Sequence, residues 1–335
     1  MNASGHNPET LHRQCFGAIM SREPLVTVSK RSHFHQSPTG IGPLACAADP
    51  AGPSLHFLFL AWSHEAPDAA RAAAREIEAA FRPYSRARVV ILANTADEAR
   101  ALCAEGLEAE EINLLLAVDE TRYVIAPPDP GFPPCTAVYV AGLEPYKRHE
   151  LAVGIDGLRL LYWRPSAGNL FRTRNLLPHA DFTNHRFGGG PHALVTGARY
   201  CSAVQSARVG LCLSDVEGPM RASIEYALLG LPVISTSATG GRVEFMDQTH
   251  GRVVPPDADA IARAVAELTR DRTPAEVVTA AALSRLARER ARFGEIAREW
   301  TTRLFGGPVS GVGDTHPRTW GLWTTRSAAQ ILQGP

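Results

Sequence analysis

From residue 136 onward, short apolar runs alternate regularly with helical segments, and this pattern limits the fold more than any other feature of the sequence. Apolar runs of about four to eight residues predict strands, and the amphipathic segments between them predict helices. The predicted strands are 136–143, 158–163, 209–214, 232–237 and 251–255, and the predicted helices are 147–155, 191–207, 220–229 and 257–271. Such alternation is typical of an α/β domain, in which helices cover a parallel sheet.

A shorter stretch of the same alternation precedes this region. Residues 55–62 and 88–95 predict buried strands, and an alanine-rich helix between them ends before Pro83. Five prolines between positions 127 and 134 predict a linker. The chain has 335 residues, and a domain usually contains about 100–200, so this organisation indicates two domains.

The remaining segments are less regular. Residues 1–54 predict a poorly ordered lead-in with one strand at 25–29, residues 274–306 predict a long amphipathic helix, and residues 307–335 form a tail. Arginines such as Arg285 and Arg288 form one face of the long helix, interleaved with glutamates. A solvated face is the favoured interpretation, and peripheral contact with a membrane surface stays open as the alternative.

Composition excludes several classes of protein. Lys plus Arg (34) equals Asp plus Glu (34), which argues against a nucleic-acid-binding protein. No apolar run approaches the roughly 18–20 residues that cross a bilayer, and the first residues lack the order of a secretory signal. The six cysteines are scattered, which is typical of a reduced chain without a structural zinc site. We therefore expect a cytoplasmic protein.

Residues 211–246 carry the strongest functional signal. A buried strand leads into an acidic turn at 214–218, and Pro219 then stands where a helix best tolerates proline, at its first position. A helix that starts at the carboxyl edge of a parallel sheet has free amides that attract a phosphate. Gly218 lets a ligand approach the backbone closely.

Two glutamates flank this predicted anion site. Glu217 precedes the helix, and Glu225 lies eight residues later, about two turns inside it. Carboxylates accept hydrogen bonds from hydroxyl groups, which sugars and ribose supply. A phosphate site between such carboxylates predicts binding of a sugar joined to a nucleoside diphosphate.

The same residues resemble the signature of retaining glycosyltransferase family 4, among the glycosyl transferases group 1, which has the two-domain GT-B fold. Glu217 and Glu225 meet the E-x7-E motif of that family. The family pattern around the motif is also matched, at Ser214, Gly218, Gly230, Pro232, Val233, Gly240, Gly241, Glu244 and Gly251. A weaker resemblance covers residues 139–152, where the family has a phosphate site. The resemblance extends over residues 88–270 in all.

The resemblance implies a role for each matching residue. Glu217 would be the catalytic residue that contacts hydroxyls of the donor sugar, and Glu225 would bind the ribose hydroxyls. Lys147 would neutralise the departing diphosphate. The other donor-binding positions implied are Gly218, Met220 and Arg221.

Two further positions follow from comparison with the family pattern. The family commonly has an arginine where this chain has Gly142, and Arg148 and Arg221 are candidate replacements. His64 follows the strand at 55–62, where the first domain of the family often presents a histidine. It is a candidate catalytic residue, with an ordinary surface histidine as the alternative.

We therefore predict a retaining glycosyltransferase with a GT-B fold of two Rossmann-like domains with parallel sheets. Residues 135–270 would bind the nucleotide sugar, and residues 55–128 would form a reduced acceptor-side domain for an unidentified saccharide, lipid-linked or small-molecule acceptor. The family generally works without a metal, and no cofactor is expected. Two alternatives stay open: a non-catalytic relative that binds a nucleotide or a partner protein, and an epimerase- or phosphorylase-like GT-B enzyme.

Overall fold

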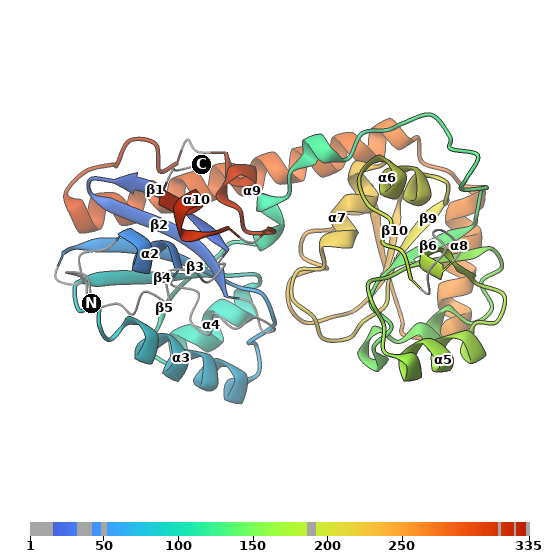
Figure 1. The fold of residues 1–335 in the computed structure, drawn as a ribbon, viewed down its shortest axis with the longest axis horizontal. Helices are drawn as coiled ribbons and strands as arrows, with labels where there is room; N and C mark the ends of the chain where they lie inside the picture. The colour runs from blue at the N-terminus through green and yellow to red at the C-terminus, as the bar shows by residue number, and fades with distance from the viewer. Residues whose placement is uncertain are drawn as a thin grey trace. The chain divides into compact units, whose positions relative to one another are not determined.

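The computed structural model describes residues 16–31, 42–47, 52–185, 192–313, 316–324 and 326–332. The chain divides into two compact units, one made of residues 1–119 and 286–335 and the other of residues 120–285. Each unit contains one β-sheet with helices on its faces (Figure 1). The α/β fold class with two Rossmann-like domains is confirmed.

The first unit contains a five-stranded sheet in the order β1-β2-β3-β4-β5. Strand β1 is antiparallel to β2, and the other neighbours are parallel. The strands are β1 (Gly17–Arg22), β2 (Leu25–Arg31), β3 (Ser54–Leu60), β4 (Ala87–Ala93) and β5 (Glu108–Glu111). The helices of this part are α2 (Gly42–Ala47), α3 (Pro67–Phe81), α4 (Ala96–Ala104) and α10 (Ala328–Leu332), with short 3₁₀ turns at Leu114–Ala117 and Pro317–Trp320.

Strand β3 is buried along its whole length because helices cover both of its faces. Phe57 and Phe59 share a core cluster with Phe293 and Trp300 of helix α9 (Ala275–Phe305). The intervening Leu58 belongs instead to a cluster with residues of α3. Alternate side chains of a strand point to opposite faces, so this continuous apolar run serves two cores.

The two ends of the chain differ from the sequence prediction. Residues 1–54 were predicted to hold one strand, but both β1 and β2 pair into the sheet, and the described part of the 307–335 tail packs against it. Val312, Trp320 and Leu322 of that tail are buried in the same core cluster as Phe57. The first unit therefore differs from the predicted 55–128: segments from both ends of the chain complete its core, and residues 120–128 belong to the second unit.

The second unit contains a parallel six-stranded sheet in the order β11-β10-β9-β6-β7-β8. The strands are β6 (Ala137–Val140), β7 (Leu158–Leu161), β8 (Asp181–Phe182), β9 (Val209–Cys212), β10 (Val233–Thr236) and β11 (Gly251–Val254). The helices are α5 (Ala167–Leu176), α6 (Gly197–Gln205), α7 (Arg221–Leu228) and α8 (Ala258–Arg270). Helix α9 begins in this unit and continues into the first at Leu286. The strand order reverses between β6 and β9, which makes this pair the topological switch point.

Two predicted elements of this unit are wrong in detail. Residues 147–155 were predicted to form a helix, but they form only short 3₁₀ turns, at Pro145–Lys147 and His149–Ala152. Arg148 lies between these turns in the left-handed conformation, with φ of 51°, which interrupts any helix. The proline cluster at 127–134 was predicted to be a linker, but it lies inside the second unit.

Helix α7 packs unusually close to the sheet. A Cβ atom at Gly210 of β9 would overlap the ring of Tyr226, so only glycine fits beneath this helix. The Tyr226 hydroxyl accepts a hydrogen bond from Val140 N of β6 (2.6 Å) and donates to Leu211 O of β9 (3.4 Å). Tyr226 thereby fixes α7 against both strands of the switch point. Within the described residues, no helix combines the length and the apolar character needed to cross a membrane.

We expect Phe293→Ala to destabilise the first unit by about 3–5 kcal/mol, because it removes a buried aromatic ring from the core. The Phe293 ring contacts those of Phe57 and Trp320 at centroid distances of 5.4 and 4.7 Å. Chemical denaturation followed by circular dichroism measures the change. Leu283→Ala on the same helix is the matched control, since Leu283 is 41% exposed. Equal losses in the two variants would contradict the assigned packing.

Candidate functional site

Three loops meet at the carboxyl edge of the second sheet, beside the switch point. They follow β6, β9 and β10 and carry Lys147, Glu217 and Arg242 respectively. A parallel strand order places the ends of these strands at one edge, where α/β proteins bind their ligands. We therefore take this charged cluster as the candidate functional site.

Glu217 is the centre of the cluster. Its Oε1 pairs with Lys147 Nζ, and its Oε2 accepts a hydrogen bond from Ser214 Oγ (2.5 Å). Arg242 Nη1 lies 3.8 Å from the same Oε2. The Glu217 side chain is 15% exposed, so it is held by protein groups and still borders solvent.

Arg242 was not singled out from the sequence. The guanidinium is fully buried and bonds Ser214 Oγ (2.6 Å), Ser214 O (2.9 Å), Ser235 Oγ (3.0 Å) and Thr236 O (3.1 Å). Gly240 and Gly241, with φ of 98° and 93°, turn the chain so that Arg242 returns beneath the site. The only sequence signal was its place between the two glycines and Glu244.

The predicted cations Lys147 and Arg148 lie in one turn after β6. Lys147 is 1% exposed, which excludes the interpretation as an ordinary exposed turn. Arg148 Nε donates to Leu213 O (2.6 Å), and its Nη2 donates to Thr236 Oγ1 (2.7 Å). Arg148 therefore ties the loop after β6 to the ends of β9 and β10.

Helix α7 starts at this edge, one residue after the start of the predicted 220–229 helix and two residues after Pro219. Arg221 is its first residue and Met220 its N-cap, so Pro219 precedes the helix and does not occupy its first position. The Met220 side chain makes no capping hydrogen bond to the first turn. Gly218 and Met220 are both buried beside it. A helix start without a side-chain cap keeps first-turn amides for an anion.

Glu225 lies deeper in α7 and is 3% exposed. It accepts hydrogen bonds from the hydroxyls of Tyr123 (2.5 Å, to Oε1) and Tyr200 (to Oε2). Arg221 Nε pairs with its Oε1 at 2.5 Å. Burial and the Glu225 charge raise the pKa of both tyrosines, so they are donors at neutral pH. Neither tyrosine was predicted from the sequence.

Gly142 stands where the family pattern has an arginine. A Cβ atom there would collide with the carboxylate of Glu144 and the ring of Trp163. The Oε2 atom of Glu144 is buried without a hydrogen-bond partner among the described residues. This part of the edge therefore holds a carboxylate and an aromatic ring instead of a cation.

The last predicted site residue, His64, belongs to the first unit. It follows β3, and its side chain is 13% exposed, so it is not an ordinary surface histidine. Its Nδ1 lies 3.3 Å from Oε1 of the fully buried Glu98. The sequence did not indicate Glu98 as a partner.

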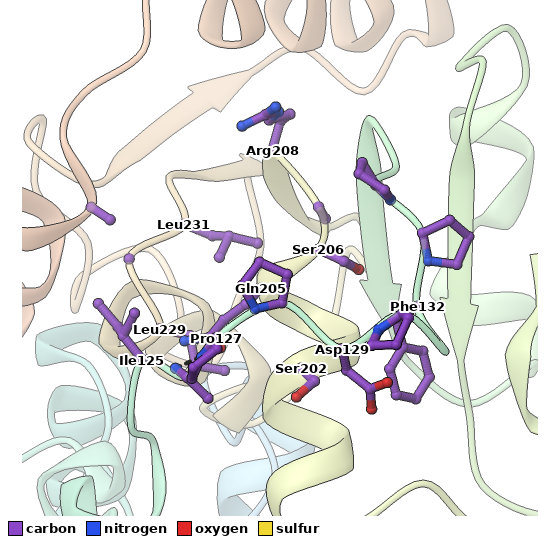
Figure 2. A pocket seen from close by; sticks show the side chains of 18 of the residues that line it. Ile125, Pro127, Asp129, Phe132, Ser202, Gln205, Ser206, Arg208, Leu229 and Leu231 are labelled. Atoms are coloured by element: carbon purple, nitrogen blue, oxygen red, sulfur yellow. Dashed lines mark hydrogen bonds between the residues drawn. The ribbon is translucent and has the colours of Figure 1, made fainter.

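A cavity lies elsewhere in the second unit. It has a volume of about 500 Å³ and is lined by residues just before β6, β9 and β10, such as Pro134, Arg208 and Pro232, with the proline cluster as one wall (Figure 2). It therefore opens at the amino ends of the strands, opposite the edge that carries Glu217. Among the described residues, no group of three or more His, Cys, Asp or Glu side chains could hold a metal ion.

Comparison with known proteins finds a family match over part of the second unit. Residues 179–271 match the family described as Glycosyl transferases group 1, and this range contains Glu217, Glu225 and Arg242. No curated protein sequence matches the chain.

Solved structures resemble the chain at low identity. AviGT4, a glycosyltransferase involved in avilamycin A biosynthesis, is 15% identical with a TM-score of 0.51, over 82% of this chain and 81% of its own. Alr3699/HepE of Anabaena, solved with UDP, is 14% identical with a TM-score of 0.49, over 73% and 72%. A trehalose-phosphate synthase of Burkholderia xenovorans is 13% identical with a TM-score of 0.49, over 73% and 72%. The likeness to AviGT4 shows the GT-B fold.

His149, next to the cationic turn, makes stability depend on pH. It is 2% exposed and neither ring nitrogen has a hydrogen-bond partner among the described residues. Burial, with the charges of Arg172 and Lys147, lowers its pKa from 6.5 to about 3. The unfolded chain therefore binds one more proton than the folded chain between these values, and stability falls as the pH falls through this window.

We expect His149 to account for a loss of about 2 kcal/mol in unfolding free energy between pH 8 and pH 5. His149→Leu removes the titrating group, so its unfolding free energy should fall by that much less over the same range. Urea denaturation at both pH values measures the difference. The exposed His179→Leu is the control, and an equal pH dependence in wild type and His149→Leu would contradict the assignment.

Proposed function

Residues 179–271 carry a glycosyl transferases group 1 region on a GT-B fold, and from this premise we propose that the chain transfers a sugar from a nucleoside-diphosphate sugar to an acceptor hydroxyl, with retention. The observation that carries the proposal is the position of Glu217. It is held by Lys147, Ser214 and Arg242 at the switch point, beside a helix start whose N-cap residue, Met220, makes no side-chain capping bond.

The donor diphosphate binds at the start of α7. First-turn amides of the helix supply hydrogen bonds, and the helix dipole favours a negative charge there. Arg148 bonds only neutral oxygens in the contacts described, so its charge is available to the diphosphate. Arg221 is neutralised by Glu225 and is the weaker replacement for the arginine missing at Gly142. These groups stabilise the leaving diphosphate without requiring a metal ion.

Glu217 orients the donor sugar. Its two oxygens accept from Lys147 and Ser214, and the remaining lone pairs accept from sugar hydroxyls. The bond between the anomeric carbon and the diphosphate oxygen breaks, a bond from that carbon to the acceptor oxygen forms, and the proton of the acceptor hydroxyl passes to the leaving diphosphate. The charge that develops on the diphosphate lies near Lys147, which is positioned before the reaction starts.

Glu225 binds the ribose in this proposal. Arg221 and Tyr123 occupy its Oε1, while Oε2 accepts from Tyr200 and keeps one lone pair. A ribose hydroxyl that donates to Oε2 would use this remaining lone pair. The two tyrosines thus hold the carboxylate in a fixed orientation for the nucleoside.

A specific observation favours one alternative function. Gly142 and Glu144 replace a cation by a carboxylate next to the phosphate site, which weakens binding of a departing diphosphate. A non-catalytic relative that binds a nucleotide, or a partner protein, would tolerate this loss. The alternative predicts nucleotide binding without turnover.

We expect Glu217→Gln to lower kcat/KM for transfer by about 100-fold or more, because the variant loses the charge that positions the sugar and Lys147. Pooled nucleotide sugars and acceptors, with products identified by mass spectrometry, provide the assay. Lys147 is buried, so the variant also loses stability, and the assay must run below its melting transition. Glu150→Gln, an exposed carboxylate in the neighbouring turn, is the matched control.

The results separate the two functions. Transfer by the wild type and the Glu150→Gln variant, with loss in Glu217→Gln, supports the glycosyltransferase. Calorimetric binding of a nucleotide with no product from any donor supports the non-catalytic relative. Full activity in Glu217→Gln would overturn the site assignment.

A further inference from the structure

The carboxyl edge of the first sheet holds a buried carboxylate that the proposed donor site does not use. His64 lies in the loop after β3, Asn94 follows β4, and Glu98 belongs to the first turn of α4. Glu98 is fully buried although it carries a carboxylate. A buried carboxylate needs several hydrogen-bond donors, so its partners indicate what it does.

Glu98 contacts four N–H donors from two loops. Its Oε1 accepts from His64 N (2.9 Å) and lies 3.3 Å from His64 Nδ1. Its Oε2 accepts from Asn94 N (2.7 Å) and Asn94 Nδ2 (3.3 Å). The carboxylate therefore joins the ends of two parallel strands, and one oxygen is devoted to His64.

These contacts go beyond capping of the helix. Thr95 is the N-cap of α4, and its hydroxyl accepts from Glu98 N (3.0 Å). In a capping box the glutamate would reach back to the amide of the N-cap residue. Here the Glu98 side chain passes Thr95 and reaches Asn94 and His64 instead. A helix-capping role does not require the contact with the imidazole.

The contact decides which nitrogen of His64 carries hydrogen. A carboxylate only accepts hydrogen bonds, so Nδ1 is the protonated nitrogen of the neutral ring. The contacts of Asn94 show Glu98 in the same acceptor role. Asn94 Oδ1 accepts from Leu114 N (3.0 Å), so Asn94 Nδ2 is the group that faces Glu98. Nε2 is left as an acceptor on a side chain that keeps 13% exposure.

We propose that Glu98 is a positioning residue that holds His64 in the Nδ1-protonated form, so that His64 Nε2 accepts a hydrogen bond from a hydroxyl of the acceptor. A carboxylate that orients an imidazole in this way is a recurring arrangement in enzymes. The role of His64 rests on the proposed glycosyl transfer, whereas the Glu98–His64 arrangement does not.

The tautomer of His64 tests the arrangement without any activity. Imidazole ¹H–¹⁵N correlation spectra of the full chain at neutral pH should show His64 with hydrogen on Nδ1, its signals assigned by their absence in His64→Ala. In Glu98→Gln the Nε2-protonated form should gain population. Hydrogen on Nε2 in the wild type would overturn the proposal.

A double-mutant cycle tests the positioning role. Glu98→Gln should lower kcat by at least about tenfold and change nucleotide affinity less than about twofold, since it acts through His64. In the His64→Ala background the same substitution should change kcat less than twofold, because the group it positions is gone. Equal losses in both backgrounds would show that Glu98 acts only on the fold, and would overturn the positioning role.

Asp97→Asn is the matched control for this experiment. Asp97 lies in the same turn of α4 but is exposed and pairs with Arg100, so its loss should leave kcat and the His64 tautomer unchanged. If no donor yields product while His64 keeps hydrogen on Nδ1, the proposed glycosyl transfer fails and the Glu98–His64 arrangement stands. If transfer occurs but His64 carries hydrogen on Nε2, the proposed glycosyl transfer stands and the Glu98–His64 arrangement fails.

Discussion

The second unit is organised around the burial of the Glu217 charge. A carboxylate that is mostly removed from water is stable only where cations and hydroxyl groups replace its hydration. Lys147, Ser214 and Arg242 do so, and they reach Glu217 from the loops after β6, β9 and β10. Each of these side chains can contact Glu217 only because the three strands end at the same edge of the sheet. The charge cluster and the parallel sheet therefore depend on each other.

Tyr226 extends this dependence to helix α7. Its ring lies against Gly210, where any side chain would collide, and its hydroxyl bonds both strands of the switch point. The helix is thus held at a fixed height above the sheet. Because Glu225 and the helix start belong to the same rigid element, the predicted anion site and the predicted ribose site keep a fixed spacing.

The sequence predicted the features that depend on local pattern. The alternation after residue 136 gave the parallel sheet, and the E-x7-E spacing located both glutamates of α7. The pattern did not predict β5, because the segment Glu108–Glu111 contains no apolar run. It also did not predict β1, a short strand that is recognisable only by its pairing with β2. The predicted helix at 147–155 failed because the left-handed Arg148 interrupts it.

The site residues that the sequence did not predict were missed for one common reason. Arg242 contacts Ser214, which is 28 residues away, and Glu98 contacts His64, which is 34 residues away. The sequence alone does not distinguish a buried arginine or glutamate from an exposed one. Only the tertiary contacts of the residue show that it belongs to a site. The local pattern Thr95-x-x-Glu98 marks Glu98 only as a capping-box residue, and nothing local indicates its contact with His64.

The charges at the carboxyl edge explain how a diphosphate could bind despite the glycine at position 142. Lys147 and Arg242 surround Glu217, and the unpartnered oxygen of Glu144 adds a second negative charge nearby. The formal charges of these four groups cancel. The net attraction must then come from Arg148, whose described contacts are neutral oxygens, and from the amides at the start of α7. Under the proposed function, Arg148 therefore takes the role of the missing arginine, because its guanidinium lies at the ends of β9 and β10, where it bonds Leu213 O and Thr236 Oγ1.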